Sequence, residues 1–254
     1  NVVAIEPTCE LYKHFARLND IEYHSVLLNE EFQLNATELL KACNKHTKLV
    51  WLCSPNTPSA NLLNVEEVDK VLKGFDGIVV IDEAYADFTR LQTFRERISD
   101  FSNLIVLNTF SKAWASAAIR LGVVYAQEAI ISIFNKVSSP YRISQLTQEQ
   151  GLDALKHRYD IEDWIKILLL ERKRMILAFE SLACCEKVYP SNANFFLAKM
   201  KDAQSVYDYL CEKGIYVRNC SNVSLCRNCL RITIGSKAEN AEILGILRYY
   251  KPTK

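Results

Sequence analysis

Five short apolar runs constrain the fold of this chain more than any other feature of its sequence. Each is rich in β-branched or aliphatic residues, and they lie at Val2–Ile5, Tyr23–Leu28, Leu49–Cys53, Ile78–Ile81 and Leu104–Leu107. Runs of this length, separated by segments with helical patterns, indicate strands that alternate with helices. This alternation predicts an α/β fold with a mostly parallel sheet flanked by helices.

Two of the intervening segments begin with a signature of helix N-termini. Asn35 is followed three residues later by Glu38, and Asn64 is followed by Glu67. In such pairs the asparagine caps the first turn and the acid reaches back to the cap. We therefore expect helices to begin at both positions, each with a reciprocal acid.

The pattern changes after Lys136, where SSPYRIS at 138–144 interrupts the alternation and a long amphipathic helix is expected at Tyr159–Leu182. Further expected elements are strands at Phe195–Ala198, Tyr216–Arg218 and Leu230–Ile234, a helix near Ala203–Lys213 and a closing helix at Lys237–Tyr250. We predict a large sheet domain at residues 1–138 and a smaller α+β domain at 139–254 that includes the long linking helix.

Charge and hydropathy narrow the possible partners. The 254 residues carry a formal net charge of +1, so the chain lacks the broad cationic surface that nucleic acids or anionic membranes attract. The sequence contains neither an apolar run of membrane-spanning length nor a signal-peptide pattern. We expect a cytoplasmic protein that acts on small molecules, and a fragment of a longer chain because it opens at Asn1 within a strand.

The nine cysteines are scattered, and without a secretory signal most of them should be reduced. Cys226 and Cys229 form one C-x-x-C motif, with Cys220 nearby. None of the four histidines lies near this motif in the sequence, so we expect no metal site.

Polar residues follow three of the predicted strands at the point where each strand ends. Asn56 follows the third strand, Asp82 and Tyr85 follow the fourth, and Ser111 with Lys112 follows the fifth. Ligands of open parallel sheets bind outside the carboxyl ends of the strands. We therefore expect these side chains to converge at one edge of the sheet.

The chemistry of this set points to one cofactor. A lysine can form a Schiff base with a carbonyl compound, and a carboxylate can keep a pyridine nitrogen protonated. Ser111 and Arg120, near a helix N-terminus, suit a phosphate group. Taken alone, Lys112 or Asp82 has an ordinary structural explanation, but together they predict pyridoxal 5'-phosphate. A dinucleotide site is disfavoured because no G-x-G-x-x-G occurs among the seven glycines.

At its ordered motifs the sequence resembles the fold-type I pyridoxal-phosphate aminotransferases and, among them, the histidinol-phosphate aminotransferases. The motifs are SPNTPSANLL at 54–63, VVIDEAYADF at 79–88, NTFSKAWASAAIRLG at 108–122, NANFFLAK at 192–199, GIYVRNCSN at 214–222 and CLRITIGS at 229–236. The resemblance implies a homodimer that transfers an amino group between glutamate and imidazole-acetol phosphate, in histidine biosynthesis, through a lysine-bound cofactor.

The resemblance also implies a role for each matching residue. The expected catalytic residues are Lys112, Asp82 and Tyr85, and the expected cofactor contacts are Asn56, Asp82, Tyr85, Ser111, Lys112 and Arg120. Arg231 would bind the α-carboxylate of the amino-acid substrate, and Arg218 would bind the phosphate of the imidazole substrate.

Several positions depart from the family pattern. Thr57 and Ala60 interrupt a motif that usually reads Asn-Asn-Pro-Thr-Gly, and Ala115 and Ala118 stand where glycines are usual. Cys9 aligns with an aromatic residue that stacks on the cofactor ring, a role that would pass to Tyr12 or another ring. Cys220 replaces a frequent third arginine. The N-terminal arm and a turn that helps to bind the phosphate are not present in this sequence.

Two other functions stay open at this stage. Threonine-phosphate decarboxylases are similar to this family and also hold a phosphorylated substrate through arginine, so Arg218 does not separate the two activities. The departures at Cys9 and the alanines, with the absent phosphate turn, are also compatible with a truncated, catalytically silent homologue.

Overall fold

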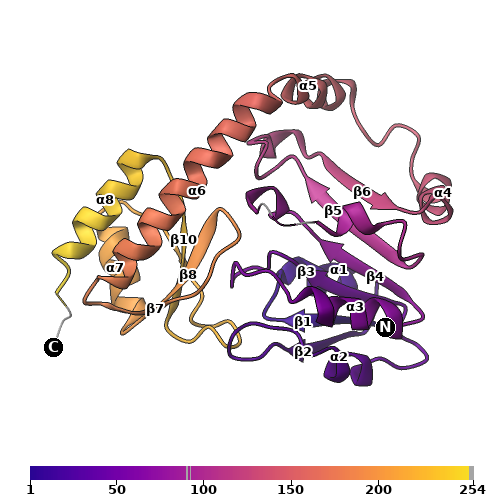
Figure 1. Ribbon diagram of the computed structural model, residues 1–254, viewed down its shortest axis with the longest axis horizontal. Helices are drawn as coiled ribbons and strands as arrows, with labels where there is room; N and C mark the ends of the chain where they lie inside the picture. The colour runs from indigo at the N-terminus through magenta and orange to yellow at the C-terminus, as the bar shows by residue number, and fades with distance from the viewer. Residues whose placement is uncertain (90, 92, 252–254) are drawn as a thin grey trace.

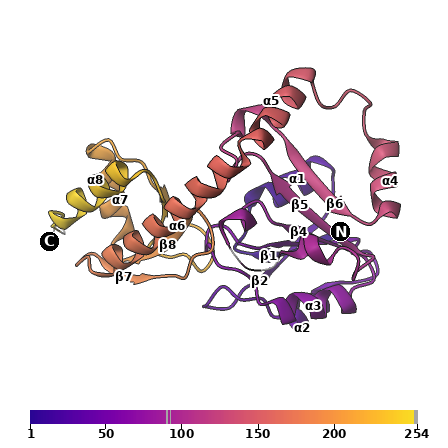
Figure 2. The same ribbon diagram turned by 45° about the horizontal axis from the view of Figure 1, so that its top comes forward.

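Two β-sheets organise the chain, and a long helix runs between them (Figure 1). The computed structural model describes residues 1–89, 91 and 93–251. The larger sheet belongs to the N-terminal half and the smaller one to the C-terminal half, and Figure 2 shows the same two lobes from a second direction.

The larger sheet has six strands in the order β2-β1-β3-β4-β5-β6. They are β1 (Val2–Glu6), β2 (Tyr23–Leu27), β3 (Leu49–Cys53), β4 (Ile78–Asp82), β5 (Leu104–Thr109) and β6 (Gly122–Ala126). The first five are parallel, and β6 runs antiparallel to β5. The predicted α/β fold with a mostly parallel sheet is therefore confirmed.

Continuous apolar runs form the central strands because both faces of the sheet are covered. Val3, Val50, Leu52 and Ile81 are fully buried. The helices of this half are α1 (Glu10–Leu18), α2 (Ala36–Ala42) and α3 (Val65–Gly74), with short 3₁₀ turns at Ala86–Phe88, Phe94–Arg97 and Ala117–Ile119.

The expected helix caps are present, but the reciprocal acids are not. The Asn35 side chain accepts a hydrogen bond from the Glu38 backbone N–H, and Asn64 accepts from those of Glu66 and Glu67. Instead of reaching back to Asn64, the Glu67 carboxylate accepts from the Ala36 backbone N–H at 2.7 Å. Glu67 therefore ties the start of α2 to α3.

The smaller sheet is antiparallel, with the strand order β7-β8-β10-β9. Its strands are β7 (Cys185–Val188), β8 (Phe195–Met200), β9 (Arg218–Asn219) and β10 (Cys229–Thr233). It packs with α7 (Ala203–Glu212), α8 (Lys237–Arg248) and the second half of α6 (Arg158–Glu180). The long helix α6 matches the one predicted at Tyr159–Leu182.

Two further helices, α4 (Glu128–Val137) and α5 (Gln145–Lys156), lie near the far end of the larger sheet (Figure 1). No residue of α4 is buried, and Ile133, Phe134 and Val137 are exposed. Together with the half-exposed strand β6, these helices leave apolar surface uncovered in the isolated chain. Within the described residues, no helix has the length and apolar character needed to cross a membrane.

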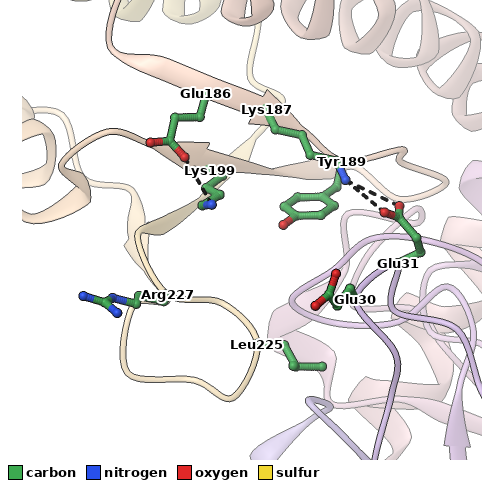
Figure 3. A pocket seen from close by; sticks show the side chains of 8 residues that line it. All are labelled: Glu30, Glu31, Glu186, Lys187, Tyr189, Lys199, Leu225 and Arg227. Atoms are coloured by element: carbon green, nitrogen blue, oxygen red, sulfur yellow. Dashed lines mark hydrogen bonds and ion pairs between the residues drawn. The ribbon is translucent and has the colours of Figure 1, made fainter.

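Apolar and charged side chains join the two sheets. Phe32 packs edge-to-face on Tyr189 with their ring centroids 5.0 Å apart, and Lys187 pairs with Glu31 at 3.1 Å. Figure 3 shows this junction, where Lys187 reaches across to Glu31 beside a cavity of about 540 Å³. These contacts fix the smaller sheet relative to the strand ends of the larger one.

Candidate active site

Lys112 lies just beyond β5, in a turn that hydrogen bonds within the chain hold in place. The Thr109 hydroxyl donates to Ser111 Oγ at 3.0 Å and accepts from the Ser111 backbone N–H. The Lys112 ammonium lies 5.3 Å from the centroid of the Tyr85 ring and makes no hydrogen bond among the described residues. The amine is therefore available to a ligand at this edge of the sheet.

Asp82 ends β4, and its two carboxylate oxygens have different partners. Oδ1 accepts a hydrogen bond from the Ala84 backbone N–H at 2.9 Å, and Oδ2 accepts from the Tyr12 hydroxyl at 2.6 Å. Burial raises the pKa of Asp82, whereas these two bonds and the charge of Lys112 oppose the rise. The Lys112 charge reaches Asp82, as expected for neighbours in one site.

Tyr85 lies between the strand ends and the smaller sheet. Its ring meets Phe195 of β8 edge-to-face at 5.1 Å. Burial raises the pKa of Tyr85 to about 12, and the charge of Arg231 opposes this rise. Tyr85 is therefore a neutral hydrogen-bond donor at physiological pH.

Arg231 of β10 brings a guanidinium group from the smaller sheet to the same edge. The group lies 4.7 Å from the Phe195 ring centroid, and Nη1 donates to the Thr57 hydroxyl at 3.1 Å. Its Nε is buried and has no hydrogen-bond partner among the described residues. An unpaired buried donor is costly, so Arg231 has capacity for an anionic ligand.

Arg218 is the register partner of Arg231 across β9 and β10. Directly opposed residues of antiparallel strands project to the same face, so both arginines belong to one side of the smaller sheet. Arg218 is exposed, and its Nη2 lies 3.8 Å from Glu10 Oε1.

The Asn56 side chain makes three hydrogen bonds within the protein, and its expected contact with the cofactor remains a proposal. Its amide donates to Pro7 O and to Ser59 Oγ, both at 2.9 Å, and its oxygen accepts from the Thr8 hydroxyl. It is completely buried. The neighbouring Thr57 contacts Arg231. The sequence predicts no contact for Thr57, although its position in the motif beside Asn56 is a signal for one.

Arg120 lies near the turn that carries Ser111, because the Leu121 carbonyl accepts from the Phe110 backbone N–H and from the Thr109 hydroxyl. Its exposed guanidinium donates through Nη1 to the Ala117 carbonyl at 2.9 Å. The phosphate role expected for Ser111 and Arg120 remains a proposal.

The departures from the family pattern have structural counterparts. Ala60 and Ala115 have left-handed backbones, with φ of 68° and 50°, whereas Ala118 lies in a 3₁₀ turn. Cys9 is half-buried, and the charges of Asp82 and Arg218 both act on its thiol. The Tyr12 ring, which was expected to replace the aromatic residue missing at Cys9, stacks instead on Trp51, with the ring centroids 4.8 Å apart.

The cysteines of the smaller domain form no metal centre within the described residues, where no group of three or more His, Cys, Asp or Glu side chains could hold an ion. All nine cysteines are free, and Cys220, Cys226 and Cys229 are completely buried. Burial raises the pKa values of these three thiols, so they behave as apolar core residues.

Comparison with known families identifies the family to which the chain belongs. The family model of aminotransferase class I and II matches residues 1–247. The chain belongs to this family. Aminotransferases of this family use pyridoxal phosphate, and the donors at the strand ends suit that cofactor. Asp82 supplies a carboxylate for a pyridine nitrogen, Lys112 an unpaired amine for an aldehyde, and Tyr85 a neutral phenol.

Curated relatives of this aminotransferase cover nearly the whole chain. It is 49% identical to the histidinol-phosphate aminotransferase of Bacteroides thetaiotaomicron, over 99% of the chain and 72% of that protein. The enzyme of the same name from Flavobacterium psychrophilum is 46% identical, over 98% of the chain and 71% of its own length.

Solved structures confirm the fold of the aminotransferase. The histidinol-phosphate aminotransferase of Clostridium acetobutylicum superposes with a TM-score of 0.90 at 24% identity, covering 97% of this chain and 76% of that one. The L-threonine-O-3-phosphate decarboxylase of Porphyromonas gingivalis gives a TM-score of 0.81, also at 24% identity, with coverages of 97% and 75%. Both likenesses show the fold alone.

Proposed function

We propose that this aminotransferase converts glutamate and imidazole-acetol phosphate to 2-oxoglutarate and histidinol phosphate. The observation that carries the proposal is the meeting of Lys112, Asp82 and Tyr85 at the strand ends with Arg231 of the smaller sheet. The choice of substrates is supported by the histidinol-phosphate aminotransferases that are 49% and 46% identical to this chain.

Pyridoxal phosphate, when bound, supplies a protonated pyridine ring that withdraws electrons from the substrate Cα. Asp82 would face the ring nitrogen, and Asn56 with Tyr85 the phenolic oxygen, while Ser111 and Arg120 would hold the phosphate. Lys112 would hold the cofactor through its Nζ, and the same Nζ, once free, would take the proton from the substrate Cα.

The two arginines of the smaller sheet would select the substrates. Arg231 has a guanidinium that can meet a carboxylate with two parallel hydrogen bonds, and its Nε is a buried donor still unpaired among the described residues. We assign to it the α-carboxylate of glutamate. Arg218 projects from the same face of the sheet, and we assign to it the phosphate of the imidazole substrate.

The homodimer and the cytoplasmic location are also parts of this proposal. Exposed apolar side chains support a second subunit, since Leu11, Phe15 and Leu18 of α1 are each more than half exposed, as is Ile133 of α4. Sedimentation analysis of the purified chain would give twice the monomer mass. Location in a cell needs a direct measurement by fractionation.

The two alternative functions have less support. A threonine-phosphate decarboxylase is similar in fold at 24% identity, whereas relatives at 46–49% identity are histidinol-phosphate aminotransferases. A silent homologue would have to retain an unpaired lysine beside a buried carboxylate without a ligand for either group.

A cofactor titration tests the proposal. Pyridoxal phosphate is added to the purified chain, the visible absorption band is followed, and the sample is reduced with borohydride before peptide mass spectrometry. We expect a saturable band and a cofactor mass on Lys112, and neither in Lys112→Ala. A well-folded protein that gives no band would favour the silent homologue.

A further inference from the structure

Tyr12 is a buried side chain whose hydroxyl group forms a hydrogen bond with Asp82. It comes from α1, and its ring stacks on Trp51 of β3 with an interplanar angle of 23°. The side chain is nearly inaccessible to solvent, and its hydroxyl donates to Asp82 Oδ2 at 2.6 Å. This distance is at the short end for hydroxyl-to-oxygen bonds, as expected when the acceptor is ionised.

Burial makes the charge of Asp82 costly, so its neighbours decide whether it is ionised. Burial raises the pKa of Asp82, and the largest opposing contribution is the Tyr12 hydrogen bond, ahead of the Ala84 N–H and the Lys112 charge. Burial also raises the pKa of Tyr12 well above its usual value. Tyr12 thus stays protonated and always donates.

The other titratable groups near Asp82 are three neutral side chains and the Lys112 amine. Burial raises the pKa values of Cys53 of β3, Cys9 before α1 and Tyr85 after β4, and the negative charge of Asp82 adds to each rise. They are neutral at physiological pH. Lys112 is the one cation that acts on Asp82 among these groups, and its amine is the group expected to bind the cofactor.

We propose that Tyr12 is a positioning residue that keeps Asp82 ionised and aimed at the ring nitrogen of pyridoxal phosphate. The role rests on the proposed function of Asp82. Tyr12 and the Ala84 N–H are the two hydrogen-bond donors within the protein that would hold the Asp82 carboxylate for the protonated ring nitrogen. A mobile phenol could not do this, but the Trp51 stack fixes the ring.

The first test needs no cofactor. Tyr12→Phe removes the hydroxyl and keeps the ring on Trp51, and Tyr189→Phe is the matched control because Tyr189 is a buried, ring-packed tyrosine at the junction of the sheets. The pKa of Asp82 is measured by ¹³C NMR of aspartate-labelled protein, with Asp82→Asn assigning the signal. Because a hydrogen bond to a charged group is worth roughly a factor of ten, we expect a rise of about one unit in Tyr12→Phe only.

The second test measures the cofactor dissociation constant against pH in the same variants. In Tyr12→Phe we expect the pH below which cofactor affinity falls to rise by about one unit, and below that pH we expect a roughly ten-fold weaker affinity than in wild type. Tyr189→Phe should show the wild-type profile. If wild type and Tyr12→Phe bind alike with the same profile and the same Asp82 pKa, Tyr12 only fills space and the inference fails. If wild type itself binds no cofactor, the proposed function fails instead.

Discussion

Alanines stand at two positions where the backbone is left-handed, and one of them gives a simple stability test. Ala115 is exposed with φ of 50°, a conformation in which a β-carbon costs about 1 kcal/mol. We predict that Ala115→Gly raises the free energy of unfolding by about 1 kcal/mol in urea denaturation. Ala60→Gly should gain less, because its methyl group is fully buried and its loss offsets the relief. Equal gains at the two sites would contradict this reasoning.

The buried carboxyl group of Glu83 predicts how the free energy of unfolding depends on pH. Its side chain is buried, with Oε1 accepting from the Phe94 N–H and Oε2 unpaired among the described residues. Burial raises its pKa from 4.5 to about 7. The folded state therefore holds a proton that the unfolded state has lost in this window. The protonated Glu83 therefore adds to the free energy of unfolding. This contribution is complete below about pH 4.5 and is lost as pH rises to about 7, with a total on the order of 3 kcal/mol.

Urea denaturation between pH 4.5 and 8 measures this loss. We predict that Glu83→Gln, which keeps the oxygen that accepts from Phe94, shows a flatter pH dependence than wild type across the window. Identical slopes for the two proteins would mean that Glu83 is ionised in the folded state.

At the scale of single elements, the cap of α3 carries a measurable share of stability. Asn64 accepts from two backbone N–H groups, those of Glu66 and Glu67, at 2.8 and 3.1 Å. We predict that Asn64→Ala lowers the free energy of unfolding by about 1 kcal/mol, and that Asn64→Gly costs only a few tenths. Equal losses for both variants would show that the lost acceptor alone sets the cost, and that the backbone preference of the new residue contributes nothing there.

The central strands could be predicted from the sequence, but two of the edge strands, β6 and β7, could not. β3 and β4 are apolar on both faces, so each appears in the sequence as a continuous apolar run. β6 is half-exposed and only five residues long, and β7 is a bulged four-residue strand beginning at Cys185. β7 has too few apolar residues to stand out from a loop. The apolar residues of β6 follow β5 through a turn and a short 3₁₀ segment, so β6 falls outside the alternation of strands and helices that reveals the parallel strands.

Site residues that directly follow a buried strand could be predicted from the sequence. Those whose orientation depends on the geometry of a turn could not. Asp82 and Lys112 follow buried runs, so their place at the sheet edge could be inferred. Whether Asn56 or Thr57 faces Arg231 depends on the turn that follows β3, in which Asn56 is held by Pro7 and Ser59. The pairing of Tyr12 with Asp82 joins residues 70 positions apart and leaves no local signal.

At the scale of the whole molecule, the two sheets are held together mainly by apolar contact. Phe32 is 1% exposed and packs on Tyr189, whereas the side chains of Lys187 and Glu31 are 44% and 65% exposed. We predict that Phe32→Ala costs about 3–5 kcal/mol in the free energy of unfolding and that Lys187→Ala changes it by less than about 1 kcal/mol. Denaturation followed by far-UV circular dichroism compares them, and a larger loss in Lys187→Ala would contradict this assignment.

Transfer of a labelled amino group tests the central claim most directly. The chain is incubated with pyridoxal phosphate, ¹⁵N-glutamate and imidazole-acetol phosphate, and the products are analysed by mass spectrometry beside Lys112→Ala. The account predicts ¹⁵N-labelled histidinol phosphate from wild type and none from the variant. Cofactor bound at Lys112 with no label in the product, or equal label in the variant, would contradict it.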